Sequence, residues 1–370
     1  MQFDNVCIQA MITILVIGYH ITSLRPVHPA LYSTSMPNTN VDHQQQIDPS
    51  IIKELTSFAH ELANVAGDAI MPYWRQKDVK VESKTEKGRS SPVTIADRSA
   101  EKAMRELIET RFPSHGIYGE EFGQVRVDSD FVWVLDPIDG TKAFITGKPT
   151  WGILIGCLYR GVPVLGVIDQ CILKERWVGS IGNPTLLNGD PVSCREIANT
   201  STVSSLCDAT LYTTNPDMFR AGEEMSKFEA VRDASLRTLY GCDCYAYALV
   251  ASGFGADAVV EAGLGLYDYA AIVPVVQGAG GIITDWKGNA LTLQNHDNSK
   301  GRVVACSNTA LHDEMLRTLS SPVAGTEQDK QQEAKGITIN KLSKRVVLRH
   351  IFTLIAGVVL GAIGKSNKIL

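Results

Sequence analysis

The chain lacks the residue patterns on which many hydrolase mechanisms depend. It has no G-x-S-x-G turn for a serine nucleophile, no H-E-x-x-H zinc motif and no glycine-rich phosphate loop that ends in lysine. It has no basic surplus either, because 35 Lys and Arg stand against 40 Asp and Glu, which gives a formal net charge of −5. A nucleic-acid backbone attracts basic surfaces, so we expect no nucleic-acid partner.

The cysteines lack the paired C-x-x-C spacing of zinc sites and redox motifs. We therefore expect reduced thiols in an intracellular compartment. Cys242 and Cys244 leave a redox pair open, but small, partly buried thiols are the simpler interpretation. The eight cysteines are Cys7, Cys157, Cys171, Cys194, Cys207, Cys242, Cys244 and Cys306.

Residues 1–47 differ in composition from the rest of the chain. An apolar run from Met11 to Gly18 leads into Ser, Thr, His, Pro and Gln, and Asp4 rather than a basic residue precedes it. A secretory signal needs a basic start, so the composition fits an organelle transit segment better, although Arg25 is its only strong base. We predict a removable or disordered leader and a chloroplast or other plastid location, with the cytoplasm as the alternative.

At the other end, residues 320–345 form a polar linker and residues 346–370 an apolar tail. Only Ile351 to Ile363 is free of charge, and these thirteen residues would rise about 20 Å as a helix. That is short of the roughly 30 Å hydrocarbon core of a membrane. We expect a docked helix or an extension without a role in the chemistry, and membrane association only if the tail is an anchor.

Residues 48–319 are expected to form the folded domain, with an N-terminal half of about 48–190 and a C-terminal half of about 191–319. Asp48 before Pro49 predicts a helix start, and apolar stripes at helical spacing predict a long helix there and another after Asp97. Short apolar runs predict strands, with a further helix from about Asp268 to Gly278. This order predicts an α+β fold. The stripes are Ile51, Leu55, Phe58, Ala59, Leu62, Ala66 and Ile70, then Ala100, Met104, Leu107 and Ile108; the strands are 131–135, 153–159, 163–168, 257–261 and 281–285.

Two aspartates directly follow an apolar strand, in the segment D-P-I-D-G-T at 136–141. Like charges this close raise each other's pKa, so ionised Asp136 and Asp139 indicate a cation between them. Hard oxygen ligands favour Mg²⁺. An Asp-Gly turn that ends the strand is the alternative for this segment alone.

Other acids could join this pair. Glu120 lies in G-E-E at 119–121 after a short apolar stretch, and Asp268 opens a predicted helix whose positive end favours an ionised carboxylate. Separately, each could be a solvated loop acid or a helix cap. Together they predict a carboxylate site for a divalent cation.

Four separated segments resemble the signature segments of the inositol monophosphatase superfamily. They are S-P-V-T-I-A-D at 91–97, G-E-E at 119–121, D-P-I-D-G-T at 136–141 and Y-D-Y-A-A-x₆-G-A-G-G at 267–281. The resemblance covers roughly residues 50–318 and implies a layered α-β-α-β-α sandwich and a homodimer. It departs at 84–90, where K-T-E-K-G-R-S is longer and more basic than the family's loop.

The resemblance also implies a reaction and roles for single residues. A phosphate monoester is hydrolysed by direct attack of water activated by two or three Mg²⁺ ions, without a covalent phosphoenzyme. Thr141 with Glu120 would orient and deprotonate this water, and Asp97 would lie near a further metal position. The 139–141 turn would offer backbone amides to the phosphate. The implied metal ligands are Glu120, Asp136, the carbonyl of Ile138, Asp139 and Asp268.

Three further segments are more similar to the histidinol-phosphatase branch, and to its plant enzymes, than to the inositol branch. They are T-K-A-F-I-T-G at 141–147, T-T-N-P-D-M-F at 213–219 and G-C-D-C-Y-A-Y at 241–247. Histidinol phosphate carries an ammonium and a partly protonated imidazole, which Asp243 and Glu261 could receive. A salt bridge to Arg232 or Arg237 is the alternative for Asp243. The implied substrate-binding residues are Glu120, Ile138, Asp139, Gly140, Thr141, Gly241, Cys242, Asp243, Glu261 and Asp268.

Other functions stay open beside histidinol-phosphate hydrolysis. An inositol or galactose phosphatase would share the metal site, and a nucleotide or fructose bisphosphatase would need additional basic groups for its second phosphate. An inactive, membrane-tethered binding protein could keep the fold without turnover. The complete set of acids and Thr141 argues against that loss of activity.

Overall fold

The computed structural model describes residues 47–322, apart from 78–79, 87–88, 196–202 and 204, and leaves the side chains of 84–92 undescribed. The predicted leader up to residue 46 and the chain beyond residue 322, including the apolar tail, lie outside the described residues. The chain divides into two units, Met1–Ile47 and Asp48–Leu370, and every described helix and strand belongs to the second. No described helix has both the length and the apolarity to cross a membrane.

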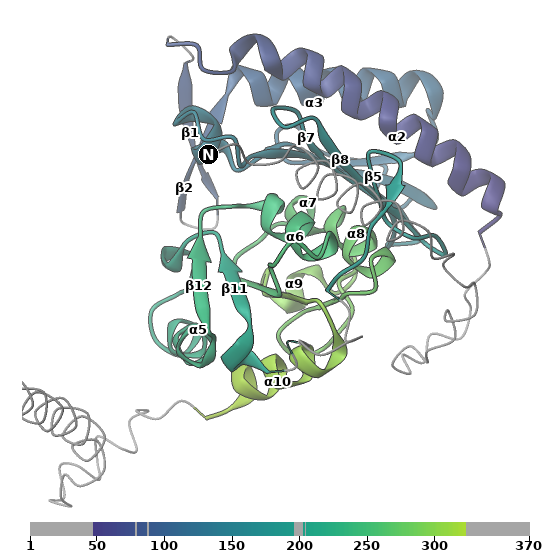
Figure 1. Cartoon of the computed structure of the whole chain (residues 1–370). Helices are drawn as coiled ribbons and strands as arrows, with labels where there is room; N and C mark the ends of the chain where they lie inside the picture. The colour runs from purple at the N-terminus through teal and green to yellow at the C-terminus, as the bar shows by residue number, and fades with distance from the viewer. Residues whose placement is uncertain (1–46, 78–79, 87–88, 196–202, 204, 323–370) are drawn as a thin grey trace, which may run out of the picture. The chain divides into compact units, whose positions relative to one another are not determined.

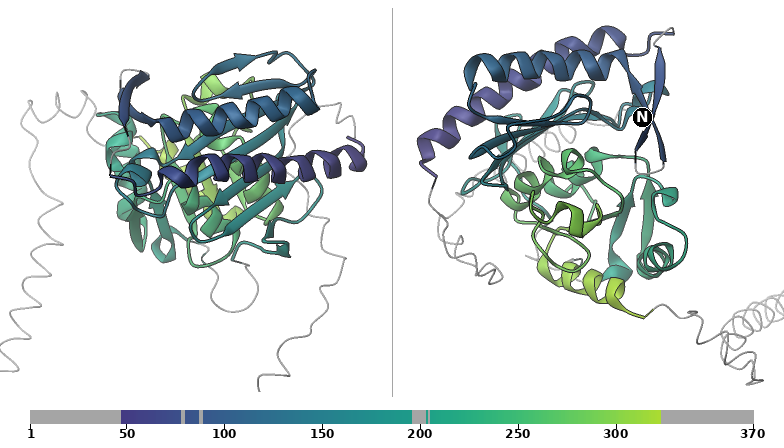
Figure 2. Two further views of the ribbon diagram at one scale, coloured as in Figure 1. Left: turned by 90° about the horizontal axis from the view of Figure 1, so that it is seen from above. Right: turned by 180° about the vertical axis from the view of Figure 1, so that it is seen from behind.

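Five layers stack in the order helix, sheet, helix, sheet, helix (Figure 1). Helices α2 (Pro49–Ile70) and α3 (Ile95–Arg111) lie side by side over the outer face of the large sheet (Figure 2). Helices α6 (Cys244–Ala251), α7 (Leu266–Tyr269) and α8 (Ile272–Gly278) lie between the two sheets, and α5 (Glu223–Ala234) and α10 (Thr309–Ser320) cover the far face of the small one. The predicted layered sandwich is confirmed.

Within the described residues, the large sheet has eight strands in the order β10-β9-β8-β7-β6-β5-β3-β4. Its pairs are antiparallel except for β3 with β5. Arg160 and Gly161 form the turn between β6 and β7, with positive φ at both residues. The strands are β3 (Gly116–Gly119), β4 (Gly123–Val125), β5 (Phe131–Asp139), β6 (Gly152–Tyr159), β7 (Val162–Gln170), β8 (Glu175–Ser180), β9 (Leu186–Leu187) and β10 (Asp190–Pro191).

In the part of the chain that the structure describes, the small sheet has five strands in the order β12-β11-β13-β15-β14. A separate hairpin of β1 (Val81–Glu86) and β2 (Arg89–Thr94) leads into α3, and the described residues of the basic segment at 84–90 belong to these two strands. The strands of the small sheet are β11 (Thr210–Thr213), β12 (Arg237–Tyr240), β13 (Ala258–Glu261), β14 (Ile282–Thr284) and β15 (Val303–Cys306); the short helices are α4 (Thr141–Ile145) and α9 (His296–Ser299).

Helix α2 starts where the sequence predicts. The Asp48 side chain accepts a hydrogen bond from the Ser50 N–H, and Pro49 occupies the first turn, where no N–H is needed. One residue of the predicted stripe is wrong: Ile51 is exposed and its neighbour Ile52 is buried. Ile51 lies four residues before Leu55 and Ile52 three, so helical spacing alone allows either isoleucine on the buried face.

The helix predicted from Asp268 to Gly278 is two helices, α7 and α8, separated at Ala270 and Ala271. Pro274 explains the break, because it has no N–H to donate to the carbonyl of Ala270 four residues earlier. The interruption shortens each helix but lets both pack closely on the large sheet. Asp268 is consequently the third residue of the four-residue α7 rather than the first residue of a long helix.

Candidate active site

The first two acids of the site lie on β5, which runs further than predicted and ends at Asp139 instead of Leu135. Along a regular strand, Asp136 and Asp139 would point to opposite faces, because side chains alternate. A bulge prevents this: Asp136 is opposite Leu154 and Asp139 is opposite Gly152, so three steps on β5 match two on β6. The extra residue lets both carboxylates reach the same place.

Asp268 of α7 joins them, and one carboxylate oxygen from each of Asp136, Asp139 and Asp268 lies within 4.8 Å of the others. Burial raises the pKa of Asp136 well above its ordinary value, and the negative charges of Glu120, Asp139 and Asp268 raise it further. Burial and then the charges of Asp243 and Asp268 do the same for the pKa of Asp139. Three acids held this close favour a bound cation over three ionised, unneutralised carboxylates.

Glu120, the fourth predicted acid, follows directly on β3. Its N–H donates to the Leu135 carbonyl of neighbouring β5 at 3.1 Å. The charge of Glu120 raises the pKa of Asp136, although Glu120 does not belong to the group of three carboxylates that meet among the described residues. Glu120 therefore adjoins the cluster.

Thr141, the first residue of α4, stands beside this cluster. Its hydroxyl lies 3.1 Å from the carbonyl of Ile138 and 3.5 Å from a carboxylate oxygen of Asp97. Asp97 is buried inside α3, where it accepts hydrogen bonds from the N–H and hydroxyl of Thr94 in a capping box. The prediction that Asp97 precedes the helix was therefore wrong by one turn, but the structure brings it to Thr141.

The N-terminus of α6 closes the other side of the site. The Cys244 N–H donates to a carboxylate oxygen of Asp139 at 2.5 Å, which joins residues from the two halves of the domain. Gly140 has φ +87°, and a Cβ built there would lie 2.8 Å from the Asp243 carboxylate. Only glycine therefore suits position 140.

Asp243 itself has a strained backbone, with φ +46° and ψ −139°. Burial raises its pKa to about 6, against the opposing effect of the positive charges of Lys148 and Lys142. Among the described residues, Asp243 makes no ion pair with Arg232 or Arg237, and Arg232 instead pairs with Asp233 at 2.8 Å. The alternative salt bridge for Asp243 is therefore absent.

Glu261, the second predicted acid of the substrate end, is buried at the end of β13. Its carboxylate accepts a hydrogen bond from the Thr214 N–H at 2.9 Å and one from the Tyr247 hydroxyl at 2.8 Å. Burial nevertheless raises the pKa of Glu261 to about 7, and the charge of Asp243 adds to the shift. Glu261 and Asp243 thus form a second acidic group beside the cluster.

Gly241 and Cys242 precede this group. The Gly241 carbonyl accepts hydrogen bonds from the Lys148 ammonium at 3.1 Å and the Thr150 hydroxyl at 3.2 Å. Cys242 is half-buried, and burial followed by the charge of Asp243 raises its pKa. Both cysteines of the supposed redox pair, Cys242 and Cys244, are free thiols.

Several residues that build the site have no part in the predicted set. Lys148 donates to the Gly241 carbonyl and Tyr247 to the Glu261 carboxylate, and such contacts between distant segments are not visible in any local pattern. Glu101 contacts the backbone around Glu120. For Glu101 a signal existed, because it lies four residues after Asp97 and therefore on the same face of α3.

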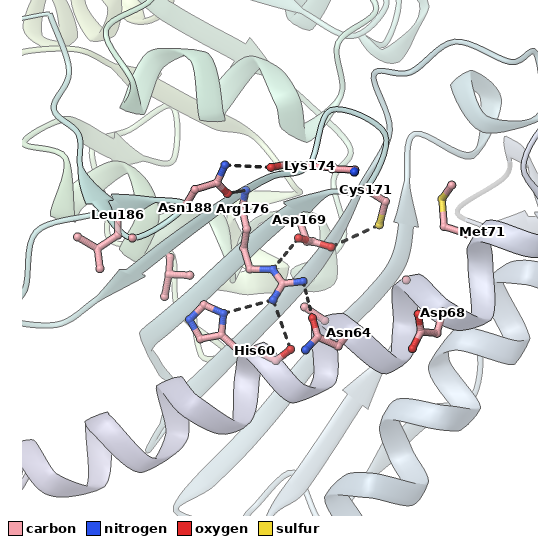
Figure 3. A pocket seen from close by; sticks show the side chains of 14 residues that line it. His60, Asn64, Asp68, Met71, Asp169, Cys171, Lys174, Arg176, Leu186 and Asn188 are labelled. Atoms are coloured by element: carbon pink, nitrogen blue, oxygen red, sulfur yellow. Dashed lines mark hydrogen bonds and ion pairs between the residues drawn. The ribbon is translucent and has the colours of Figure 1, made fainter.

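A hollow lies away from these acids, between α2 and strands β7 to β9 (Figure 3). Its volume is about 700 Å³. Arg176 crosses it, donating to Asp169 at 2.6 Å and to Asn64 at 3.0 Å, and contacting His60. The polar side chains in the hollow form hydrogen bonds with one another, so we interpret it as a polar contact between α2 and the large sheet.

Known proteins share this fold. The model of the inositol monophosphatase family matches residues 52–323, and the chain belongs to that family. A chloroplastic bifunctional phosphatase of Arabidopsis thaliana is 45% identical over 293 residues, which cover 78% of this chain and 81% of that protein. The protein is thus a phosphatase of the inositol monophosphatase type.

Relatives named histidinol-phosphatase and relatives named inositol monophosphatase are about equally similar in sequence to this chain. A histidinol-phosphatase of Chlorobaculum parvum is 33% identical and covers 74% of this chain and 97% of its own. An inositol-1-monophosphatase of Synechocystis is 32% identical, with 77% and 94% covered. Among solved structures, the inositol monophosphatase of Zymomonas mobilis has a TM-score of 0.63 and 42% identity, with 73% and 98% covered.

Proposed function

We propose that this phosphatase hydrolyses L-histidinol phosphate to L-histidinol and phosphate, in histidine biosynthesis, with Mg²⁺ as cofactor. The observation that carries the proposal is the second acidic group, Asp243 and Glu261, beside the three-carboxylate cluster. The cluster suits a divalent cation and the phosphate, and the second group suits a cationic alcohol. A neutral polyol would offer no positive charge to offset the burial of two further acids.

The donor set fits magnesium. Asp136, Asp139 and Asp268 supply oxygen ligands that are buried and close together, and Glu120 and the carbonyl of Ile138 adjoin them. We propose these five groups as the ligands of two or three ions. When bound, Mg²⁺ neutralises phosphate charge, lowers the pKa of water and stabilises the departing alkoxide.

Thr141 and Glu120 orient the attacking water in this proposal. The hydroxyl proton of Thr141 is directed to the Ile138 carbonyl or the Asp97 carboxylate, so its oxygen is left to accept a hydrogen bond from water. Glu120 takes a proton from that water while the water oxygen attacks phosphorus. The ester P–O bond breaks on the opposite side, and the alkoxide takes a proton from a second water molecule to give the alcohol; the resulting hydroxide is neutralised by the proton that Glu120 releases.

The relatives support the phosphatase chemistry, and their names suggest two candidate substrates. The histidinol-phosphatases of Chlorobaculum parvum and Mycobacterium tuberculosis are 33% and 32% identical to this chain. The inositol monophosphatase of Zymomonas mobilis is 42% identical, which makes inositol 1-phosphate the second candidate. The charge of Asp243 and Glu261 favours histidinol phosphate.

A direct comparison of substrates tests the proposal. Phosphate release by the full chain is measured with saturating Mg²⁺, with histidinol phosphate and inositol 1-phosphate at equal concentrations below saturation. We expect a preference of roughly a hundredfold for histidinol phosphate, or about 2.7 kcal/mol of transition-state stabilisation. Comparable rates, or a preference for inositol 1-phosphate, would refute the substrate and keep the phosphatase.

We also propose a plastid location and a homodimer. The name of the Arabidopsis relative, a chloroplastic protein, supports the first together with the composition of residues 1–47. A fluorescent fusion of the full chain in plant cells tests the location, and a cytoplasmic signal would contradict it. Light scattering at micromolar concentration should give twice the chain mass.

A further inference from the structure

Glu101 is a buried acid of α3 to which neither the sequence nor the proposed reaction assigns a role. It is fully buried and lies one helical turn after Asp97, on the same side of the helix. Asp97 reaches Thr141. Glu101 reaches the segment that bears Glu120.

The Glu101 carboxylate accepts hydrogen bonds from two consecutive backbone N–H groups that follow Glu120. One oxygen accepts from the Glu121 N–H at 2.7 Å, and the other accepts from the Phe122 N–H at 3.1 Å and from the Arg105 guanidinium at 2.7 Å. Both oxygens are therefore occupied by donors. The side chain fixes the two peptide units on the C-terminal side of Glu120.

The residue before Glu120 is held by the same carboxylate. A Cβ built on Gly119 would lie 1.9 Å from an oxygen of Glu101, so the acid packs directly on the Gly119 backbone. The Glu120 N–H is bound to the Leu135 carbonyl of β5. The backbone on both sides of Glu120 is thus fixed, and Glu101 supplies most of this support.

Helix α3 consequently holds both partners of the proposed water-orienting pair. Asp97 contacts Thr141, and Glu101 contacts the segment that bears Glu120. Positions 97 and 101 are separated by a rise of about 6 Å, and a helix is stiff over one turn. We propose that Glu101 is a positioning residue that sets the place of Glu120 relative to Thr141; this inference rests on the proposed function.

Glu101→Gln tests it, because glutamine has the same shape but only one acceptor oxygen. Whichever way the amide turns, its NH₂ group faces an N–H donor of the Glu120 segment, and the segment must shift. Glu224→Gln is the matched control. Glu224 is also a buried helical acid that accepts from a backbone N–H, of Arg220 at 2.7 Å, and from an arginine, Arg302 at 2.8 Å, but it lies on α5.

Three quantities are measured on the full chain. For Glu101→Gln we expect kcat at saturating Mg²⁺ to fall ten- to a hundredfold while the Michaelis constant stays within about threefold. Hydrogen–deuterium exchange of peptides spanning 119–123 should accelerate at least tenfold. Calorimetric titration with Mg²⁺ alone should show weaker binding. Glu224→Gln should leave all three within twofold of the unsubstituted protein.

The outcomes separate the two hypotheses. No magnesium-dependent phosphate release by the unsubstituted protein would refute the proposed function. An active protein whose Glu101→Gln variant matches Glu224→Gln in kcat and in exchange would overturn the positioning role alone. If Glu101→Gln does not fold, Glu101→Asp keeps the charge beside Arg105 but withdraws the carboxylate by about one methylene; unchanged kcat in that variant would equally overturn the role.

Discussion

Recognition of the alcohol half of the substrate can be tested at Glu261. Glutamine keeps the size of the side chain, can accept from the Thr214 N–H and can donate to the Tyr247 oxygen, so the fold is little perturbed while the negative charge is lost. Because burial raises the pKa of Glu261 to about 7, a larger fraction of the native carboxyl is ionised at pH 8.5 than at pH 7. The charge effect should therefore grow with pH.

The expected size follows from the burial of Glu261. Two unit charges about 4 Å apart attract by about 4 kcal/mol at an effective dielectric constant of about 20. Desolvation of both groups offsets part of this, and hydrogen bonds to charged groups contribute about 1.5–3 kcal/mol net. We expect Glu261→Gln to lower kcat/KM for histidinol phosphate ten- to a hundredfold at pH 8.5, and that for inositol 1-phosphate less than threefold.

Initial rates of phosphate release at pH 7.0 and 8.5, with saturating Mg²⁺, measure this selectivity. Glu175→Gln is the control, because Glu175 accepts a hydrogen bond at 2.8 Å from Tyr245 of the same helix α6, so this variant alters a similar tyrosine–glutamate contact. Equal losses for both substrates in Glu261→Gln, or the same change of selectivity in Glu175→Gln, would refute the charge argument.

Three further predictions concern the cluster. Asp136→Asn should lower kcat more than tenfold at saturating Mg²⁺, since a ligand loses its charge; steady-state rates within tenfold, about 1.4 kcal/mol, would contradict this. Gly140→Ala should lower kcat at least tenfold and the free energy of unfolding by about 1–2 kcal/mol, because of the positive φ and the approach to Asp243; kinetics and urea unfolding measure both. In EDTA, the free energy of unfolding should fall as pH rises from about 4.5 to 7, because the raised pKa values of Asp136, Asp139 and Glu261 keep protons on the folded chain that the unfolded chain has released. Glu261 alone would account for about 3 kcal/mol of this fall. Mg²⁺ should remove most of the dependence of the free energy of unfolding on pH. A free energy of unfolding that does not change with pH in EDTA would count against the cluster.

The helices of the fold were largely predictable, because the sequence signals for them are local. Helix α2 and its Asp48 cap follow from spacing and from the proline in the first turn. The break between α7 and α8 was also predictable, since Pro274 removes a hydrogen bond that a continuous helix requires. The error at Ile51 shows the limit of a stripe, because at a helix start only packing decides which of two neighbouring isoleucines is buried.

The acids of the site were recognisable, but their geometry was not. The bulge on β5 depends on its register with β6, and the contact of Asp139 with the Cys244 N–H joins residues 105 positions apart. Such pairings arise from tertiary structure rather than from local propensity. The same holds for Glu101, whose helical position was readable but whose partners lie on a segment about twenty residues later.

The hydrogen bond between the Cys244 N–H and the Asp139 carboxylate determines when the cluster can be completed as the chain is synthesised. The described strands of the large sheet have all been synthesised by residue 191, whereas α6 and α7 follow more than fifty residues later. Domains tend to fold in the order of synthesis. During this interval the nascent sheet carries Asp136 and Asp139 without the amide or the third carboxylate that completes the cluster. The proposed magnesium site is thus completed late in translation, and a truncated chain that ends before α6 would have an incomplete cluster.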